Sequence, residues 1–415
     1  MHVTPATPSP TDPAGADLRG EIARAWASLL NQADAIADDI ALTLLQRDKS
    51  WYDSVSPELR AEVRASTREH VRRGIRTMAG LAEDDEKAIH IWRATGRRRA
   101  RQGVPMELVL NAYSLGTRVL WEALLQQRHN AALHIDDHVL LIAGQRIWAA
   151  LDVQNATLVE SYRRESNRLQ RRDLQRQQSL LDGLVEGRGA DGNFAREVRD
   201  VLGVRLDEPV ACVVAHFDGA LDEPLRAPED RLERVGVLSY WHVRGGAYFG
   251  LVPLSTLGVA EVISVLEPAV SGRVGVAAAP EGFAGFARAY QLAARVADTL
   301  PRGEHRVVAV TDRLPEVLLG ASPEVTSLLV EEALGGLLAQ PAPLADLLLE
   351  TLRALILHGG SPTHAAAELF CHRNTVIYRI KQIEALTGRR LGDSRDKLLL
   401  SLALMSVEQS RAPQP

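Results

Sequence analysis

The chain has 415 residues, a length that predicts about two to four domains rather than one. Hydrophobic residues make up 46% of it and charged residues 24%, which is typical of a globular protein and excludes a disordered or fibrous one. The longest apolar runs fall far short of the ~18 residues that a membrane-spanning helix needs, so we expect no membrane partner. The net charge of −5 excludes a uniformly basic nucleic-acid coat but leaves room for a local basic patch.

The cysteine content is typical of a reducing compartment. Cys212 and Cys371 are the only cysteines, and neither belongs to a Cys/His cluster with zinc spacing. His134 and His138 are four residues apart, a spacing that puts two imidazoles on one helical face, but no third ligand is evident. The two aspartates between them are better explained as a helix cap. We therefore expect a cytoplasmic protein without a metal or another cofactor.

The N-terminal part of the chain has a helical pattern. Residues 1–17 are rich in proline and lack an apolar stretch, which predicts a disordered tail rather than a signal peptide. Residues 18–157 show apolar positions at three- and four-residue steps, so we expect an all-helical domain, with one helix starting at Ser56 and Pro57. Residues 158–184 continue as a polar, arginine-rich helix. We interpret this stretch as a solvated connector; a coiled coil with irregular heptads is the alternative.

The pattern changes in residues 185–312. Apolar, β-branched runs predict strands at 209–217, 235–243, 247–254, 272–279 and 305–310. Amphipathic segments between them predict helices, so we expect an α+β domain of the order βαββαβ with helices on one face of the sheet. Gly245 and Gly246, between the second and third strands, predict a hairpin turn.

Residues 321–409 return to a helical pattern, and their segment 358–391 carries the strongest functional signal. Helix caps divide this segment into the end of one helix, a short second helix and a third helix. The capping residues are Gly359, Gly360, Ser361, Pro362, Asn374 and Gly388. Two short helices joined by a tight turn form a helix-turn-helix.

The helix expected to start at Asn374 has two different faces. Its inward face is apolar and comprises Val376, Ile377, Ile380 and Ile383. The opposite face and the N-terminus carry groups that can bond to base edges or phosphates. Five Lys/Arg and one Glu between 371 and 390 give a local charge of +4, as nucleic-acid binding requires. An ordinary helical hairpin with a solvated face is the alternative.

A resemblance to a known family supports the DNA-binding interpretation. The run HRNT at 372–375, the pair Tyr378-Arg379 and the run IEALTG at 383–388 resemble the C-terminal helix-turn-helix of the PucR/CdaR family of bacterial regulators. The resemblance covers about 320–410. It implies a double-stranded DNA operator as partner and a homodimer that reads a two-fold site. The DNA-contacting residues that it implies are Arg373, Asn374, Thr375, Tyr378 and Arg379, and Gln382 shares their face.

The other two regions also resemble known domains. The stretch 100–124 is similar to the RsbRD-type N-terminal domain, a helical sensor module of stress signalling, from which no ligand residue can be carried over. The middle region resembles a GGDEF-like domain. The run RGGAYF at 244–249 falls on the hairpin where diguanylate cyclases carry Gly-Gly-Asp-Glu-Phe, so the corresponding residues here are Gly245, Gly246, Ala247, Tyr248 and Phe249.

The middle domain lacks the acids that cyclase chemistry needs. Mg²⁺ prefers carboxylate ligands, but Ala247 and Tyr248 replace both hairpin acids. On the first strand, His216 and Asp218 stand where cyclases carry a further metal-binding aspartate, so at most one carboxylate remains. We therefore predict a degenerate domain and a protein that is not an enzyme.

The whole sequence predicts a cytoplasmic bacterial transcriptional regulator with three modules. An unidentified small-molecule or protein effector, sensed in the N-terminal or middle domain, would control DNA binding. Two alternatives stay open. One is an enzyme of the nucleotide-cyclase class or a protein that only binds a nucleotide, and the other is a stress-signalling scaffold that uses protein contacts.

Overall fold

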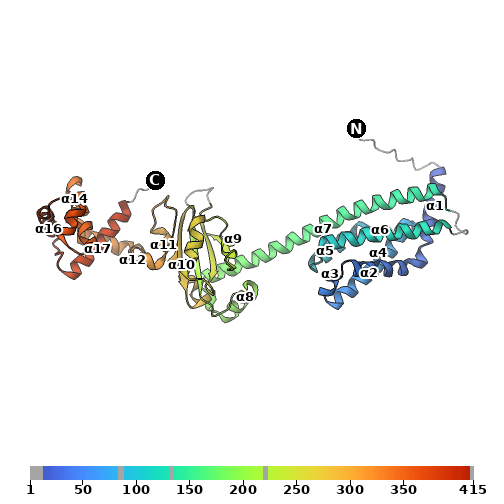
Figure 1. Ribbon diagram of the computed structural model, residues 1–415, viewed down its shortest axis with the longest axis horizontal. Helices are drawn as coiled ribbons and strands as arrows, with labels where there is room; N and C mark the ends of the chain where they lie inside the picture. The colour runs from blue at the N-terminus through green and yellow to red at the C-terminus, as the bar shows by residue number, and fades with distance from the viewer. Residues whose placement is uncertain (1–12, 83–87, 130–134, 218–222, 412–415) are drawn as a thin grey trace, which may run out of the picture. The chain divides into compact units, whose positions relative to one another are not determined.

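The computed structural model describes residues 13–82, 88–129, 135–217 and 223–411. These residues divide into two compact units, one on each side of the Asp173–Leu174 bond, and we describe each unit by itself (Figure 1). Within the described residues, no helix combines the length and the apolar character needed to cross a membrane.

The regular structure of the first unit is all-helical, as the sequence predicts. Its helices are α1 (Pro13–Ala27), α2 (Ala33–Arg47), α3 (Lys49–Ser54), α4 (Pro57–Met78), α5 (Ala88–Arg101), α6 (Met106–Gln126) and the first part of α7 (Asp137–Val185). Residues 13–17, the end of the expected disordered tail, lie in α1, which corrects that expectation. Residues 1–12 are outside the described residues.

Two predicted helix starts in this unit are confirmed. Ser56 Oγ accepts a hydrogen bond from the Leu59 amide at 3.3 Å, and Pro57 is the first residue of α4. At the start of α7, Asp136 Oδ1 accepts a hydrogen bond from the His138 amide at 2.9 Å. This aspartate therefore caps the helix. His134, the other member of the histidine pair, lies outside the described residues.

Helix α7 is one continuous helix of 49 residues, and it contributes to two hydrophobic cores. Its first part buries Ala143 and Ile147 in the core of the first unit, beside residues of α1, α2, α4 and α6. Its last turns bury Leu181 and Leu184 in the core of the α+β domain. Between these ends the helix is polar, and Leu174 is 56% exposed. The expected connector is therefore the C-terminal part of a longer helix.

The middle of the chain forms the predicted α+β domain. Its strands are β1 (Val210–His216), β2 (Tyr240–Arg244), β3 (Ala247–Pro253), β4 (Arg273–Ala279) and β5 (Arg306–Ala309). They form one five-stranded sheet in the order β2-β3-β1-β4-β5, in which only the pair β4 and β5 is parallel. The helices between the strands are α9 (Pro228–Glu233), α10 (Val259–Leu266) and α11 (Phe286–Asp298). The chain order from β1 to β4 and α11 matches the prediction.

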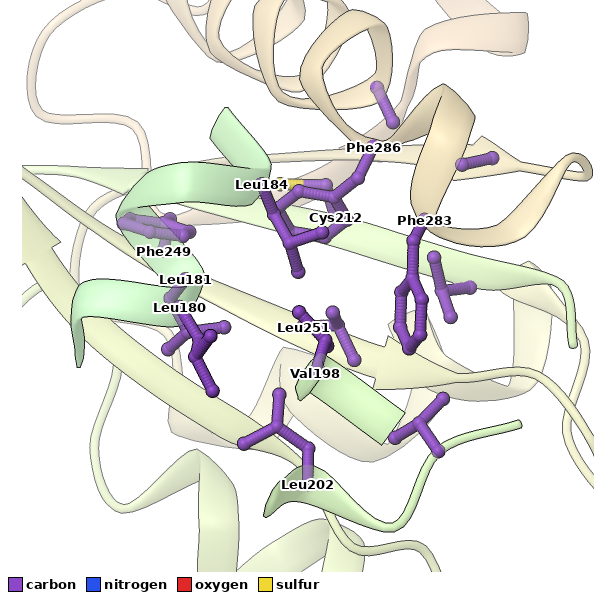
Figure 2. Packing of buried hydrophobic residues seen from close by; sticks show 14 of the residues in the cluster. Leu180, Leu181, Leu184, Val198, Leu202, Cys212, Phe249, Leu251, Phe283 and Phe286 are labelled. Atoms are coloured by element: carbon purple, nitrogen blue, oxygen red, sulfur yellow. The ribbon is translucent and has the colours of Figure 1, made fainter. Parts of the chain in front are cut away.

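Helices cover both faces of this sheet, so the expectation of one covered face is wrong. On one face, the end of α7, α8 (Gly192–Leu202) and α11 pack against the strands. Figure 2 shows the core on this face, which contains Leu184, Cys212, Phe249 and Phe286. On the other face, α9 and α10 cover a core that contains Val213, Val252, Val262 and Val276. The reason lies in β1, where every residue from 210 to 215 is buried, so that its side chains need a core on both sides.

The C-terminal part of the chain is helical. Its helices are α12 (Leu314–Ala321), α13 (Pro323–Leu338), α14 (Ala342–Leu357), α15 (Pro362–Glu368), α16 (Arg373–Thr387) and α17 (Ser394–Arg411). Helices α13, α14, α16 and α17 share a core around Leu334, Leu352 and Ile383. A Cβ atom on Gly336 would lie 2.1 Å from the Leu386 carbonyl oxygen, so only glycine lets α13 approach the end of α16 so closely.

Candidate nucleic-acid interface

Helices α15 and α16 form the predicted helix-turn-helix, and most of its expected caps are present. Ser361 Oγ accepts a hydrogen bond from the His364 amide at 3.4 Å, and Pro362 is the first residue of α15. Gly388 ends α16 in the left-handed conformation, with φ of 65°. Glycine therefore supplies the helix end that the sequence predicts.

The start of α16 lies earlier in the chain than predicted. The helix begins at Arg373, and its N-cap is His372 rather than Asn374. The His372 ring atom Nδ1 accepts a hydrogen bond from the Asn374 amide at 3.2 Å, so the histidine takes the part expected of an asparagine oxygen. The side chain of Asn374 is thus not used as a cap, and it is exposed.

The inward face of α16 follows the prediction in its main residues. Val376 and Ile383 are fully buried, whereas Ile377 and Ile380 are half-buried. Val376 packs against a small cluster that includes Ala365 of α15 and residues of α14. This packing fixes the rotation of α16 about its axis and therefore decides which side chains face solvent.

The exposed face of α16 carries several of the predicted contact residues. Arg373 and Asn374 are exposed at the helix N-terminus, and neither side chain has a partner among the residues that the structure describes. Tyr378 is 62% exposed, and its hydroxyl oxygen accepts a hydrogen bond from Gln382 Nε2 at 3.4 Å. Thr375 and Gln382 are half-buried at the edges of this face. The free polar groups therefore concentrate in the first turns of the helix.

Arg379 does not face outward as the sequence analysis expected. Its side chain is half-buried, and Nη1 donates a hydrogen bond to Thr351 Oγ1 of α14 at 3.2 Å. Thr351 itself is fully buried. At about 100° per residue, Arg379 lies only about 60° from Val376 around the helix, which is at the border of the inward face. The guanidinium therefore ties α16 to α14.

Lys381 was missing from the residues predicted from the sequence. It is exposed on α16, and its spacing of seven residues from Asn374 and three from Tyr378 puts all three on one face. The same spacing could have identified it from the sequence. Phe370, in the turn between α15 and α16, is 97% exposed and has a φ of 50°, a conformation that non-glycine residues seldom adopt. No sequence signal indicated its exposure.

The basic charge of this region is only partly available to a ligand. Arg389 forms an ion pair with Asp396 at 3.2 Å, and Arg379 is bound to Thr351 as described. The Arg390 amide, and then Arg389, holds the pKa of the Asp396 carboxyl below its ordinary value, so this acid stays ionised. The exposed cations that remain from the predicted charge of +4 are Arg373, Lys381 and Arg390.

The hairpin between β2 and β3 has the predicted turn but apolar surroundings. Gly245 and Gly246 have φ values of 55° and 79°, the two left-handed positions of a tight hairpin turn. Ala247 is 5% exposed and Phe249 is fully buried. The Tyr248 hydroxyl donates a hydrogen bond to Glu229 Oε1 of α9 at 2.8 Å, and burial followed by this carboxylate raises the pKa of Tyr248. Each replaced position of the hairpin is therefore part of the packing.

Among the described residues around the hairpin, no group of three or more His, Cys, Asp or Glu side chains is placed to hold a metal ion. On β1, His216 pairs with Ala247, and its Nε2 lies 3.3 Å from the Ala294 carbonyl oxygen of α11. Asp218 lies outside the described residues. A methyl group, a hydrogen-bonded phenol and an imidazole are not the oxygen-rich set that this ion prefers. Arg244, which precedes the turn, instead forms ion pairs with Asp182 of α7 at 2.9 Å and with Glu186, the residue after the end of α7, at 3.1 Å.

Three family models match consecutive parts of the chain. They are the RsbT co-antagonist protein rsbRD N-terminal domain over residues 34–177, the GGDEF-like domain over residues 186–299 and the PucR C-terminal helix-turn-helix domain over residues 348–406. The three resemblances seen in the sequence are therefore confirmed. The chain carries an RsbRD-type N-terminal domain, a GGDEF-like middle domain and a PucR-type helix-turn-helix.

Several relatives share shorter stretches with the chain. An uncharacterized protein of Mycobacterium tuberculosis (strain ATCC 25618 / H37Rv) is 36% identical over 118 residues, which are 28% of this chain and 26% of that protein. The carbohydrate diacid regulator of Escherichia coli (strain K12) is 44% identical over 63 residues, which are 15% of this chain and 16% of the regulator. The proline-responsive transcriptional activator PutR of Bacillus subtilis (strain 168) is 42% identical over 62 residues, which are 15% of each chain.

These matches span about a quarter or less of each relative's length. The crystal structure of a regulator of polyketide synthase expression from Bifidobacterium adolescentis is 21% identical, covers 57% of this chain and 99% of its own, and superimposes with a TM-score of 0.29.

Proposed function

We propose that the protein is a bacterial transcriptional regulator of the PucR/CdaR type that reads a DNA operator with the exposed face of α16. One observation carries the proposal. The first turns of α16 present Arg373, Asn374 and Tyr378 to solvent, on a helix whose rotation is fixed by buried apolar residues. Recognition helices contact base edges with their N-terminal residues. The match to the PucR-type domain supports the same function.

The side chains of α16 have different roles in this proposal. Asn374 and Arg373 are suited to bidentate contacts with adenine and guanine edges in the major groove. Lys381 and Tyr378 lie further along the face and reach phosphates or base edges. Arg379 acts as a positioning residue through Thr351, because its bond to α14 leaves it off the exposed face. Thr375 and Gln382 border the face and add contacts at its edges.

The protein binds its operator as a homodimer in this proposal. A single recognition helix covers only half of a typical site, and two-fold operators place two half-sites about 34 Å apart. The proposed activity needs no catalysis. Ala247 and Tyr248 cannot hold a metal ion against a nucleoside triphosphate, and both take part in the packing around the hairpin.

A signal reaches the DNA-binding part through helix α7 in this proposal. The signal is sensed in the N-terminal or the middle domain. Helix α7 contributes apolar residues to the core of each, and Arg244 of the hairpin binds its last turns. In this proposal, α7 carries a change from the first core to the second. Replacing Arg244 with alanine should weaken the response of operator binding to an effector without abolishing operator binding itself.

Capture of genomic DNA tests the proposal. Fragments bound by the purified full-length protein are sequenced, and we expect one recurrent motif with two-fold symmetry. The Asn374→Ala variant should lose this enrichment, whereas Asn167→Ala, the same substitution on an exposed part of α7, should retain it. Absence of any enriched motif would contradict the proposal. Turnover of GTP with Mg²⁺ would instead favour the cyclase-type alternative.

A further inference from the structure

The helical domain of the first unit contains a partly open cavity of about 210 Å³. Its walls come from all seven helices of this unit, α1 to α7, so a molecule inside it would lie between helices that are distant in the sequence. The cavity is larger than the roughly 150 Å³ apolar cavity that accepts benzene in a protein interior. Protein cores are close-packed, and an empty space of this size costs stability because the side chains around it lose packing contacts.

Most of the cavity wall is apolar. The larger side chains that line it include Trp26, Ile40, Leu44, Met78 and Trp92. Gly74 of α4 and Gly116 of α6 also line it, and no atom lies within 4 Å of the place where a Cβ on Gly74 would be. The absence of side chains at these two positions opens the space. A ligand that fills it therefore needs an apolar body.

One part of the wall is polar and is organised around His70. Its Nδ1 bonds to the Ser66 carbonyl oxygen, which can only accept, so Nδ1 carries the proton. Its Nε2 lies 3.1 Å from Thr95 Oγ1 and therefore accepts the hydroxyl proton. Burial lowers the pKa of His70, which keeps the ring neutral at pH 7. His70 and Thr95 thus satisfy each other and leave no free donor for a ligand.

Tyr113 supplies a free donor beside this pair. Its ring meets the His70 ring edge to face, with centroids 5.5 Å apart. The Tyr113 hydroxyl oxygen is buried and forms no hydrogen bond with the described residues. Burial raises the pKa of Tyr113 to about 12 and outweighs the lowering by the nearby Thr95 hydroxyl, so the phenol keeps its proton. Trp26 Nε1 is a second buried donor without a partner, on a residue that also lines the cavity. Buried donors without partners are rare and costly in folded proteins.

Arg99 adds a positive charge to the same wall. Its side chain is only 6% exposed, and Nη1 is 2.7 Å from Gln102 Oε1 and 3.6 Å from Glu62 Oε1. Glu62 is 41% exposed, so its carboxylate is partly solvated and balances the buried cation incompletely. A buried cation favours an anionic partner.

We propose that this cavity is a binding site for a small carboxylic acid with an apolar, ring-sized or branched body. The carboxylate accepts hydrogen bonds from Tyr113 and lies near the Arg99 charge, and the body packs against Trp26 and Trp92. The proposal deepens the proposed function, because it names the class of signal that the first unit senses. Its test uses no DNA, so its failure is distinguishable from a failure of operator binding.

Binding to the full-length protein is measured by titration calorimetry and by the shift in melting temperature. The probes are benzoate, 3-phenylpropionate and isovalerate, with toluene as an apolar probe without a carboxylate. We expect saturable binding of at least one carboxylate, about tenfold tighter than toluene, since one hydrogen bond to a charged group is worth at least that factor.

Three variants test whether the probes bind in this cavity. Tyr113→Phe removes the free donor and keeps the ring, so it should weaken carboxylate binding about tenfold and leave toluene binding unchanged. Gly74→Leu fills the cavity and should abolish binding of both kinds of probe while the melting temperature stays equal or rises. Tyr162→Phe is the matched control, because its hydroxyl donates to the Val104 carbonyl oxygen at 2.9 Å and its residue does not line the cavity.

Each result decides the proposal. Carboxylate binding that Tyr113→Phe weakens and Gly74→Leu abolishes supports it. The proposal is overturned if none of the carboxylates binds the wild-type protein below about 10 mM. It is also overturned if toluene binds as tightly as the carboxylates, or if both cavity variants bind like the wild type.

Discussion

The helix-turn-helix and the hairpin at 244–250 both keep the residues that shape their backbones, but they differ in what their side chains do. In α16, the capping residues hold a helix whose first turns present Arg373 and Asn374 without partners in the described structure. In the hairpin, Gly245 and Gly246 hold the turn, but the next three side chains pack into the domain. The comparison teaches that the backbone shape of a motif does not by itself establish a functional site. Free polar groups at the right place are also needed.

Among the substitutions considered, Gly336→Ala should have the largest effect on stability and operator binding, because the packing that orients α16 is tightest at this residue. Gly336→Ala would put a methyl group 2.1 Å from the Leu386 carbonyl oxygen, so α13 and α16 must separate. We expect the free energy of unfolding of this part to fall by about 3 kcal/mol and operator binding to be lost with it. Chemical denaturation and gel shift measure the two effects. Gly335→Ala is the control and should leave both quantities nearly unchanged. A Cβ atom on Gly335 would contact only a carbon of the flexible Glu331 side chain, at 3.9 Å. A harmless Gly336→Ala would refute the tight packing of α13 against α16.

The next largest effect is expected on operator binding, from substitutions on the exposed face of α16. Asn374→Ala should weaken binding to the best operator by about 1–3 kcal/mol, because a bidentate base contact is lost, with no change in melting temperature. Lys381→Ala should weaken binding at all sequences alike and lower the salt dependence by about one ion. Fluorescence anisotropy over a salt series separates the two variants. If Asn374→Ala weakened all sequences equally, Asn374 would not read bases.

A smaller effect tests the position of Arg379. Both Arg379→Ala and Thr351→Val remove the 3.2 Å hydrogen bond between α16 and α14. Each should lower the free energy of unfolding by about 1 kcal/mol and weaken operator binding to a similar degree. Thermal denaturation and gel shift on both variants provide the measurement. Loss of binding in Arg379→Ala alone would show that the guanidinium contacts DNA and not only Thr351.

The smallest effect is expected in the hairpin. Tyr248→Phe removes the hydrogen bond to Glu229 and should cost about 1 kcal/mol of stability, with operator binding unchanged. Phe249→Leu, at a neighbouring buried position, provides a comparison in which only packing changes. A Tyr248→Phe variant that changed operator affinity with an unaltered melting temperature would give the hairpin a role beyond packing.

The sequence predicted those features that depend on local signals. The caps at Ser56, Ser361 and Gly388 and the two-glycine hairpin follow from the chemistry of single residues, and the structure confirms them. The apolar face around Val376 and Ile383 follows from helical periodicity. These signals need no knowledge of which elements pack together.

The features that the sequence did not predict depend on tertiary packing. The hydrogen bond of Arg379 joins residues 28 positions apart, and nothing near Arg379 in the sequence indicates Thr351. The sequence favours Asn374 over His372 as the cap of α16, because asparagine is the commoner capping residue. The second covered face of the sheet also depends on contacts between distant segments. The cavity beside Tyr113 forms only where seven helices meet, so no sequence pattern marks it.

The most direct test of DNA reading by α16 is a competition titration at physiological salt. The captured operator and a scrambled fragment of equal length compete for the full-length protein, for the wild type and for Asn374→Ala. We predict that the wild type prefers the operator by about a thousandfold or more and that the variant loses at least about tenfold of this preference. Equal affinity of the wild type for the two fragments, or an unchanged preference in Asn374→Ala, would contradict the account.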